Sequence, residues 1–204
     1  MEREFKWMIP DPSEFDPIAD SSTVSALVQK KGRLEMEAMY YDTADNLIAR
    51  CHGGLRLRRE NETRVVCLKL AAESGFGGAR KAREEYECTA PDIRTGIQNL
   101  PAAGAPQDIC DCLLQANLIE LGRTAFTRFW FLLSYQGCTC ELAFDYGKLT
   151  RNGLVGPICE MELELKSGSR QALDAFARDF AAKYALKSEE KSKFARALTL
   201  YKEV

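Results

Sequence analysis

The sequence predicts an α+β protein in which antiparallel strands form a barrel with a charged interior and helices packed outside. In one expected strand after another, charged residues occupy one face and apolar residues the other. Helical segments are available to cover the apolar faces, and the many carboxylates on neighbouring strands would repel one another unless a cation lay among them. The alternation also fits a sheet with its apolar face on a core and its charged face in water. The barrel is favoured by the helices, by the carboxylates, and by the choice of charges, since Glu-x-Glu occurs at both ends of the chain and Arg-x-Arg in the middle.

Five strands are expected in the first half of the chain, at residues 1–9, 34–43, 55–59, 64–70 and 83–89. The first strand sets the pattern, because Glu2, Glu4 and Lys6 alternate with apolar residues. Short helices are expected over residues 23–31 and 45–50, each ended by glycine. The glycine-rich segment 71–82 lacks a strand-to-helix context, so we expect a flexible hairpin loop rather than a phosphate-binding loop.

The second half begins with a helical excursion over about residues 91–120, which is rich in Pro, Gly, Ala and Leu. Strands resume at residues 124–135, 139–146 and 158–166, and the last of them carries Glu160, Glu162 and Glu164 on one face. The tail, over about residues 168–202, is expected to form two helices, of which the second starts near Ser188.

The composition is that of a globular chain without a strong overall charge. The 204 residues carry a net charge of −2, which argues against a surface given over to nucleic acid or to an anionic membrane. No apolar run is long enough to span a bilayer, and the N-terminus is a charged strand rather than a signal peptide. We therefore expect a cytoplasmic protein, monomeric or homodimeric, with neither nucleic acid nor membrane as a partner.

The 8 cysteines are expected to be reduced and to act as small apolar residues. Cys110-x-Cys112 and Cys138-x-Cys140 lack the two-residue gap that is usual for zinc, and His52 is the single histidine. A metal or disulfide framework is the less favoured alternative.

The charged faces indicate phosphoryl-transfer chemistry. Clustered carboxylates without histidine are hard oxygen ligands, which suit Mg²⁺ or Mn²⁺, and Arg and Lys in the same cavity would bind phosphate oxygens. The acidic members are Glu2, Glu4, Glu85, Glu87, Glu141, Asp145, Glu160, Glu162 and Glu164. The basic members are Lys6, Arg56, Arg58, Lys69, Arg83 and Arg128.

Several short motifs occur in a specific order: Glu2-x-Glu4-x-Lys6, Tyr40-Tyr41-Asp42-Thr43, Gly54-Leu55-Arg56-Leu57-Arg58, Leu68-Lys69, Arg83-x-Glu85-x-Glu87, Arg128, Asp145, Glu160-x-Glu162-x-Glu164 and Ser192-Lys193. Together they resemble the CYTH domain of the triphosphate tunnel metalloenzyme superfamily, and the sequence is most similar to its bacterial inorganic triphosphatases. The resemblance implies a single CYTH domain over residues 1–204, built as an eight-stranded antiparallel β-barrel that forms a tunnel. Many of these triphosphatases carry a further helical domain, so the chain is expected to be a stand-alone enzyme or one domain of a longer one.

The resemblance also implies roles for individual residues. Triphosphate binding falls to Lys6, Arg56, Arg58, Arg83, Arg128 and Lys193, with Lys191 as a fallback for the last. Binding of Mg²⁺ or Mn²⁺ falls to Glu2, Glu4, Glu160 and Glu162, with Glu85 and Asp145 for a second metal or its waters. The catalytic set is Lys69, which would orient or activate the attacking water, with Glu2 and Glu4. The family often has a second basic residue two positions before Arg128, where this sequence has Phe126.

The implied reaction is metal-dependent hydrolysis of a triphosphate, with inorganic tripolyphosphate giving pyrophosphate and phosphate. A class IV-type adenylyl cyclase and a thiamine triphosphatase are alternatives that use the same cavity. Trp7, Trp130 or Tyr146 could then stack on a base or thiazolium, although a core role is favoured for each tryptophan. An alternative of another class is a non-catalytic module that binds polyphosphate or nucleotide.

Overall fold

A computed structural model describes residues 3–71 and 83–200, with Arg83 described by its backbone alone. The predictions for Glu2, for the loop 72–82 and for the Arg83 side chain lie outside these described parts. The chain forms a mixed α+β fold around a sheet of nine strands. The strands are β1 Glu4–Met8, β2 Val28–Thr43, β3 Gly54–Glu60, β4 Thr63–Ala71, β5 Arg83–Thr89, β6 Leu118–Tyr135, β7 Cys138–Arg151, β8 Leu154–Gly168 and β9 Lys187–Ser188.

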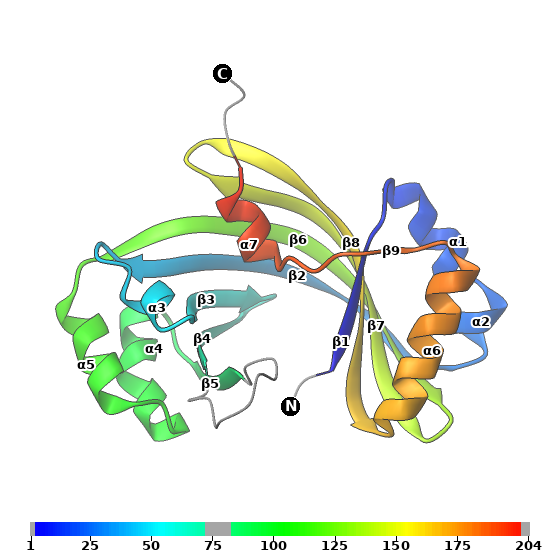
Figure 1. The fold of residues 1–204 in the computed structure, drawn as a ribbon, viewed down its shortest axis with the longest axis horizontal. Coiled ribbons are helices and arrows are strands. Elements are labelled where there is room, and N and C mark those ends of the chain that lie inside the picture. The colour runs from blue at the N-terminus through cyan, green and yellow to red at the C-terminus, as the bar shows by residue number, and fades with distance from the viewer. Residues whose placement is uncertain (1–2, 72–82, 201–204) are drawn as a thin grey trace.

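The sheet is antiparallel throughout and runs in the order β5-β4-β3-β2-β6-β7-β8-β1-β9. It curves into an arch, with β2 and β6 as the roof, β3 to β5 as one side, and β7, β8 and β1 as the other (Figure 1). All eight expected strands are present, and the two-residue β9 joins β1 as a ninth. Within the described residues β5 and β9 are unpaired edges, so a closed eight-stranded barrel is not confirmed.

Most helices cover the convex side of the arch, as expected (Figure 1). On one side lie α1 Phe15–Ala19, α2 Ser22–Ser25 and α6 Arg170–Lys183, and on the other lie α3 Leu47–Arg50, α4 Ile93–Asn99 and α5 Gln107–Gln115. Two short 3-10 helices, η1 and η2, occupy Pro12–Glu14 and Leu100–Ala103. The last helix, α7 Lys193–Leu198, instead packs on β6 and β7 from the concave side, where Ala197 contacts Leu149 and Ile158.

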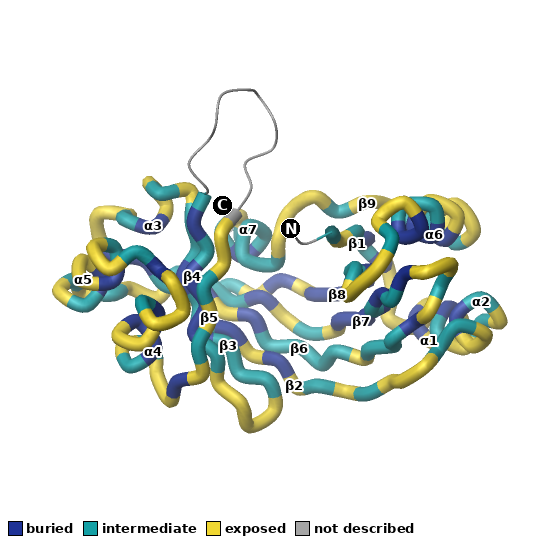
Figure 2. The backbone as a smooth tube through the Cα atoms, turned by 90° about the horizontal axis from the view of Figure 1, so that it is seen from below, coloured by how far each residue is buried: buried dark blue, intermediate teal, exposed yellow. Residues whose placement is uncertain are grey.

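Two apolar clusters form the main core, one under each group of outer helices. Trp7, Phe144 and Phe180 belong to the first, which packs β1, β7 and β8 against α6. Leu68 and Ile97 belong to the second, which packs β4 against α4. The apolar strand faces therefore point outward to helices, which confirms the predicted orientation of β1 and the core role of Trp7. Figure 2 shows the same division, with buried segments in the strands and inner helical turns, and exposed segments in turns and outer helical surfaces.

Three predicted boundaries are wrong. The helix expected over 23–31 ends at Ser25, because the chain pairs with β6 from Val28 onward and this pairing overrides the local helical pattern. The excursion expected to reach residue 120 ends earlier, since β6 starts at Leu118. The second tail helix does not start near Ser188, which lies in β9; it starts after Ser192, whose Oγ accepts a hydrogen bond from the Ala195 amide.

All eight cysteines are free, as predicted, and five of them are buried. Across the described part of the chain, no helix is both long and apolar enough to cross a membrane.

Candidate active site

The concave face of the sheet encloses a cavity of about 660 Å³ with a densely charged lining. Charged side chains line both sides of the arch, and the roof contributes apolar groups from β2 together with Phe126 and the charged Arg128 from β6. The principal lining residues are Glu4, Lys6, Leu34, Met36, Ala38, Tyr40, Arg56, Arg58, Lys69, Glu85, Glu87, Phe126, Arg128, Glu141, Glu162, Glu164, Lys166 and Lys193. This arrangement matches the predicted inward orientation of the charged strand faces.

Three carboxylates gather at one place on β7 and β8, and we call Asp145, Glu160 and Glu162 the carboxylate cluster. Asp145 and Glu160 face each other across the β7–β8 ladder, and Glu162 follows on the same face because side chains alternate along a strand. One oxygen from each residue lies within 4.8 Å of the others. Asp145 and Glu160 have no exposed surface, so their charges require nearby cations.

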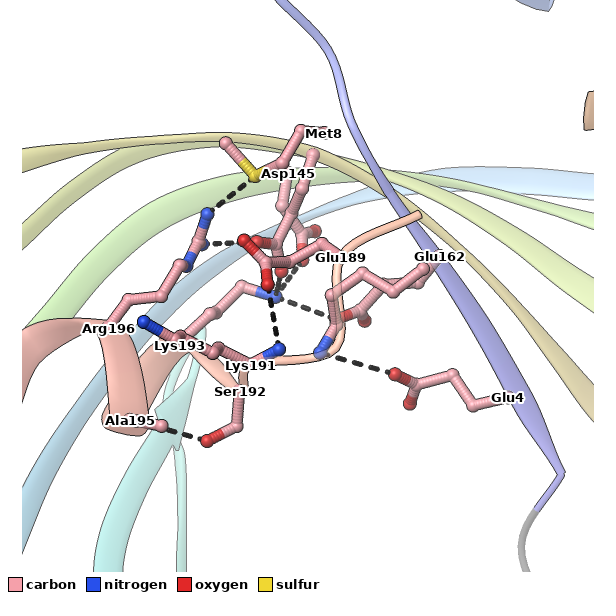
Figure 3. A network of polar contacts seen from close by, with 12 residues as sticks. Glu4, Met8, Asp145, Glu162, Glu189, Lys191, Ser192, Lys193, Ala195 and Arg196 are labelled. Atoms are coloured by element: carbon pink, nitrogen blue, oxygen red, sulfur yellow. Dashed lines mark hydrogen bonds and ion pairs between the residues drawn. The ribbon is translucent and has the colours of Figure 1, made fainter. Parts of the chain in front are cut away.

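Cationic side chains surround the cluster, and Figure 3 shows Lys193 reaching toward Asp145 and Glu162. The Lys193 Nζ atom, at the start of α7, lies 2.7 Å from Asp145 Oδ2 and 2.9 Å from Glu162 Oε1, and it also contacts Glu160 Oε1. Arg128 donates to both Asp145 oxygens, with Nε–Oδ1 and Nη2–Oδ2 distances of 2.7 Å, and its Nη2 also donates to Glu162. The predicted substrate-binding residues Arg128 and Lys193 thus lie beside the predicted metal ligands.

Sequence reasoning did not assign Arg196, which also belongs to the site. Its Nη2 donates to Glu160 Oε2, and its Nη1 lies 2.8 Å from the sulfur of Met8. Lys193 and Arg196 are three residues apart on α7, so both reach the same side of the helix. In the sequence, Arg196 could have been found from its three-residue spacing to Lys193, taken together with Glu160-x-Glu162 in an expected strand.

Within the cluster, the pKa values of Glu160 and Glu162 are shifted in opposite directions. Burial alone would raise the pKa of Glu162, but Lys193 and Arg128 hold the pKa well below its ordinary value. Burial raises the pKa of Glu160 despite the nearby Lys193. Burial would lower the pKa of Lys193, yet the carboxylates of Asp145, Glu162 and Glu160 raise it above its ordinary value, so Lys193 is a cation at neutral pH.

Strand β1 brings further predicted residues to the cluster. Lys6 faces Glu162 across the β1–β8 ladder, with a distance of 3.8 Å between its Nζ and Glu162 Oε1. Its Nζ also lies 3.5 Å from Glu4 Oε1. Glu4 lines the cavity, as the sequence predicts, and faces Glu164 across the β1–β8 ladder.

The opposite side of the arch holds a second charged group on β3, β4 and β5. Arg56 Nη2 lies 3.6 Å from Glu85 and 3.5 Å from Glu87, and Arg58 Nη2 lies 3.7 Å from Glu87. Lys69 Nζ lies 2.8 Å from Glu85 Oε2. These predicted phosphate-binding and water-orienting residues are therefore neighbours, across the cavity from the carboxylate cluster.

The second group also contains a thiol. Cys67 Sγ donates to Glu85 Oε1 at 3.1 Å, and burial raises the pKa of Cys67 to about 12, so the thiol keeps its proton. Glu85 and Asp145 were predicted as candidates for a second metal or for its waters. The structure instead places Glu85 with Cys67 and Glu87, and Asp145 in the carboxylate cluster.

The structure also gives the surroundings of Asp42, Trp130 and Tyr146, which the sequence singled out. Asp42 is buried and accepts hydrogen bonds from the amides of Thr43, Ile48 and Ala49, so its motif fixes the start of α3. Trp130 packs on Gly32, where an added Cβ would lie 2.7 Å from the indole. Tyr146 is 52% exposed on the convex face, opposite in orientation to Asp145.

Fold and site together define a protein whose antiparallel sheet curves around a cavity with cations for an anionic ligand and carboxylates for a hard metal. The sequence profile of the CYTH domain matches residues 1–198, and the chain belongs to this family. An inorganic triphosphatase of Haemophilus influenzae is 31% identical over 137 residues, which are 67% of this chain but 38% of that protein. The chain thus spans well under half the length of this relative.

Solved structures share the fold at low sequence identity. A protein from Hippeastrum described as having a dominant triphosphatase activity aligns with a TM-score of 0.59 and 20% identity, over 99% of this chain and 98% of that one. A protein of Pyrococcus horikoshii aligns with a TM-score of 0.54 and 16% identity, over 95% and 98% of the two chains. At such identities the likeness shows the fold alone.

Proposed function

We propose that the protein hydrolyses a phosphoanhydride bond of a triphosphate, and that inorganic tripolyphosphate is its substrate, giving pyrophosphate and phosphate. The single observation that carries the proposal is the carboxylate cluster placed beside Arg128, Lys193 and Lys6 in one cavity. The descriptions of the Haemophilus and Hippeastrum proteins support the same activity.

The donor set of the cluster fits a hard divalent cation. Asp145, Glu160 and Glu162 offer carboxylate oxygens within 4.8 Å of one another, and Mg²⁺ and Mn²⁺ prefer such ligands. These three residues would hold the ion, with Glu4 and Glu2 as proposed further contributors. A bound divalent cation supplies charge neutralisation of phosphate oxygens during phosphoryl transfer.

The remaining work falls to cationic side chains of this chain. Arg56 and Arg58 from one side of the cavity, and Lys6, Arg128 and Lys193 from the other, would hold the phosphate oxygens and align the scissile bond. Arg83 is proposed as a further ligand of the substrate. Lys69, fixed by Glu85, would orient the attacking water for in-line displacement.

A non-catalytic module that only binds polyphosphate is the rival from another class. Such a module needs the cations but has no need for three carboxylates gathered within 4.8 Å of one another, since they repel a polyanion. The carboxylate cluster therefore favours hydrolysis.

The test is the variant Glu160→Gln, which keeps the size of the buried side chain and removes its charge. We expect metal-dependent phosphate release from tripolyphosphate to fall at least about a hundredfold, within the range for loss of a transition-state electrostatic contact. The control is Glu120→Gln, because Glu120 pairs with Arg123 and is exposed. Full activity of Glu160→Gln with unchanged metal affinity would refute the assignment of the cluster.

A further inference from the structure

Lys193 stands between the cavity and the deepest carboxylates of the cluster. Its side chain lines the cavity and is 11% exposed, whereas Asp145 and Glu160 have no exposed surface. Its Nζ contacts Asp145 Oδ2, Glu160 Oε1 and Glu162 Oε1. An ion that enters from the cavity therefore meets the Lys193 ammonium before it meets Asp145 and Glu160.

The ammonium and a divalent cation would use the same oxygens. Mg²⁺ binds carboxylate oxygens at about 2.0–2.1 Å, and the Lys193 Nζ lies 2.7 Å from Asp145 Oδ2 and 2.9 Å from Glu162 Oε1. Two like charges held this close in a buried site repel strongly, so the cluster has room for one of them at a time.

Lys193 can move away from the carboxylate cluster, and Arg196 would not take its place because Arg196 contacts the other oxygen of Glu160. Lys193 is the first residue of α7, and its ammonium sits on a flexible four-carbon stem at the cavity wall. Phe126 offers it a second contact, with its ring centroid 4.9 Å from Nζ. Arg196 takes Glu160 Oε2 and so neutralises part of the cluster without covering Oε1.

We propose that Lys193 is an exchangeable cation, which competes with the divalent cation for the carboxylate cluster and moves to the phosphate oxygens when a triphosphate enters. The inference rests on the proposed function. It implies that substrate and metal assist each other's binding, because the substrate removes the competitor of the metal, and such coupling is reciprocal.

The variant Lys193→Met tests the competition with two separate titrations. Calorimetry with Mn²⁺ alone should show binding at least about tenfold tighter than in the wild type, as expected for a coupling of ordinary size. Titration with tripolyphosphate alone, in EDTA, should show weaker binding, since one phosphate ligand is lost. Equal or weaker Mn²⁺ binding by Lys193→Met would overturn the proposal.

Lys166→Met is the matched control, because Lys166 lines the same cavity but pairs with Glu141 and Glu164 rather than with the cluster. We expect its Mn²⁺ affinity to change much less than that of Lys193→Met. Thermal unfolding is a second measurement, and it can be used even if Lys193→Met is less stable, because each protein is compared with and without Mn²⁺. Mn²⁺ should raise the unfolding midpoint of Lys193→Met more than that of the wild type. An equal rise would count against the exchange.

The double variant Lys193→Met with Glu160→Gln separates this proposal from the proposed function. Loss of Mn²⁺ binding in the double variant, together with tight binding in Lys193→Met, supports both. An Mn²⁺ affinity that Glu160→Gln leaves unchanged would refute the metal site itself. Mn²⁺ binding that needs Glu160 but is not tightened by Lys193→Met would refute the exchange alone.

Discussion

Arg128 and Asp145 face each other across the β6–β7 ladder, and the Arg128 guanidinium donates hydrogen bonds to both Asp145 carboxylate oxygens, with two donor–acceptor distances of 2.7 Å. Asp145 has no exposed surface, and the same guanidinium also donates to Glu162. A planar fork of this kind sets the orientation of a carboxylate as well as its charge. Arg128 thereby fixes two members of the carboxylate cluster while it lines the cavity.

The two-pronged pair makes Arg128→Lys an informative substitution. Lysine keeps the charge but cannot donate to both oxygens in one plane, so Asp145 and Glu162 lose their fixed orientation. We expect kcat/KM for tripolyphosphate to fall by roughly ten- to a hundredfold, with a thermal midpoint within a few degrees of the wild type. Arg123→Lys is the control, since Arg123 is exposed and pairs with Glu120. Equal kinetics in the two variants would contradict the role of the fork.

Gly147 allows β6 and β7 to approach closely under Phe126. A Cβ at position 147 would lie 2.2 Å from the Ala125 carbonyl oxygen and 2.5 Å from Phe126 Cα. We expect Gly147→Ala to lose about 1–3 kcal/mol in the free energy of unfolding, as overpacked sites do, measured by denaturant titration. Gly54→Ala should lose less, because its Cβ would have no neighbour within 4 Å. Equal losses would show that the approach is not tight.

Much of the fold could be predicted from the sequence because the strand faces alternate so regularly. The period of two put Glu4 and Lys6 on one face and Trp7 on the other, and the clustered carboxylates and available helices favoured the charged face as the inner one; the structure agrees. Only the first residues of β2, 28–33, were missed, because their partners in β6 lie about a hundred positions away and the local pattern carries no trace of the pairing. The two-residue β9 depends on pairing with β1 and has no pattern of its own.

The site was predictable as a set of residues but not as two groups. Sequence spacing placed Glu160 and Glu162 together on one strand face, yet it could not show that Asp145 joins them while Glu85 lies with Cys67. That division follows from the order of strands in the sheet, which puts β5 and β7 on different sides of the arch. Arg196 was missed for another reason, because it reaches its partner Glu160 only through the docking of α7.

Cys67 should be chemically inert in the folded protein. Burial raises the pKa of its thiol to about 12, and Cys140 has the same pKa for the same reason, so few thiolates form at pH 8. Iodoacetamide should modify the exposed Cys112 first and both buried thiols only after denaturation, as measured by peptide mass spectrometry. Modification of Cys67 at the rate of Cys112 would show that β4 opens readily.

Glu162 should make stability depend on pH in the acidic range. Lys193 and Arg128 hold its pKa below the ordinary 4.5, so the unfolded chain takes up a proton near that pH while the folded chain does not. Its stabilising contribution is present above about pH 5 and is lost as the pH falls further, by up to about 1.4 kcal/mol per pH unit. Unfolding measured between pH 5 and 3 should be less pH-dependent in Glu162→Gln, and equal slopes would contradict the shift.

The proposed hydrolysis of tripolyphosphate can be measured as phosphate release. The protein would be assayed with Mg²⁺, with Mn²⁺ and with EDTA, and thiamine triphosphate, ATP and long-chain polyphosphate would be run in parallel. We expect metal-dependent formation of phosphate and pyrophosphate in equal amounts from tripolyphosphate, and we expect it to be lost in EDTA and in Glu160→Gln. Release that is the same in EDTA, or cyclic AMP from ATP with no hydrolysis of tripolyphosphate, would contradict the proposed function.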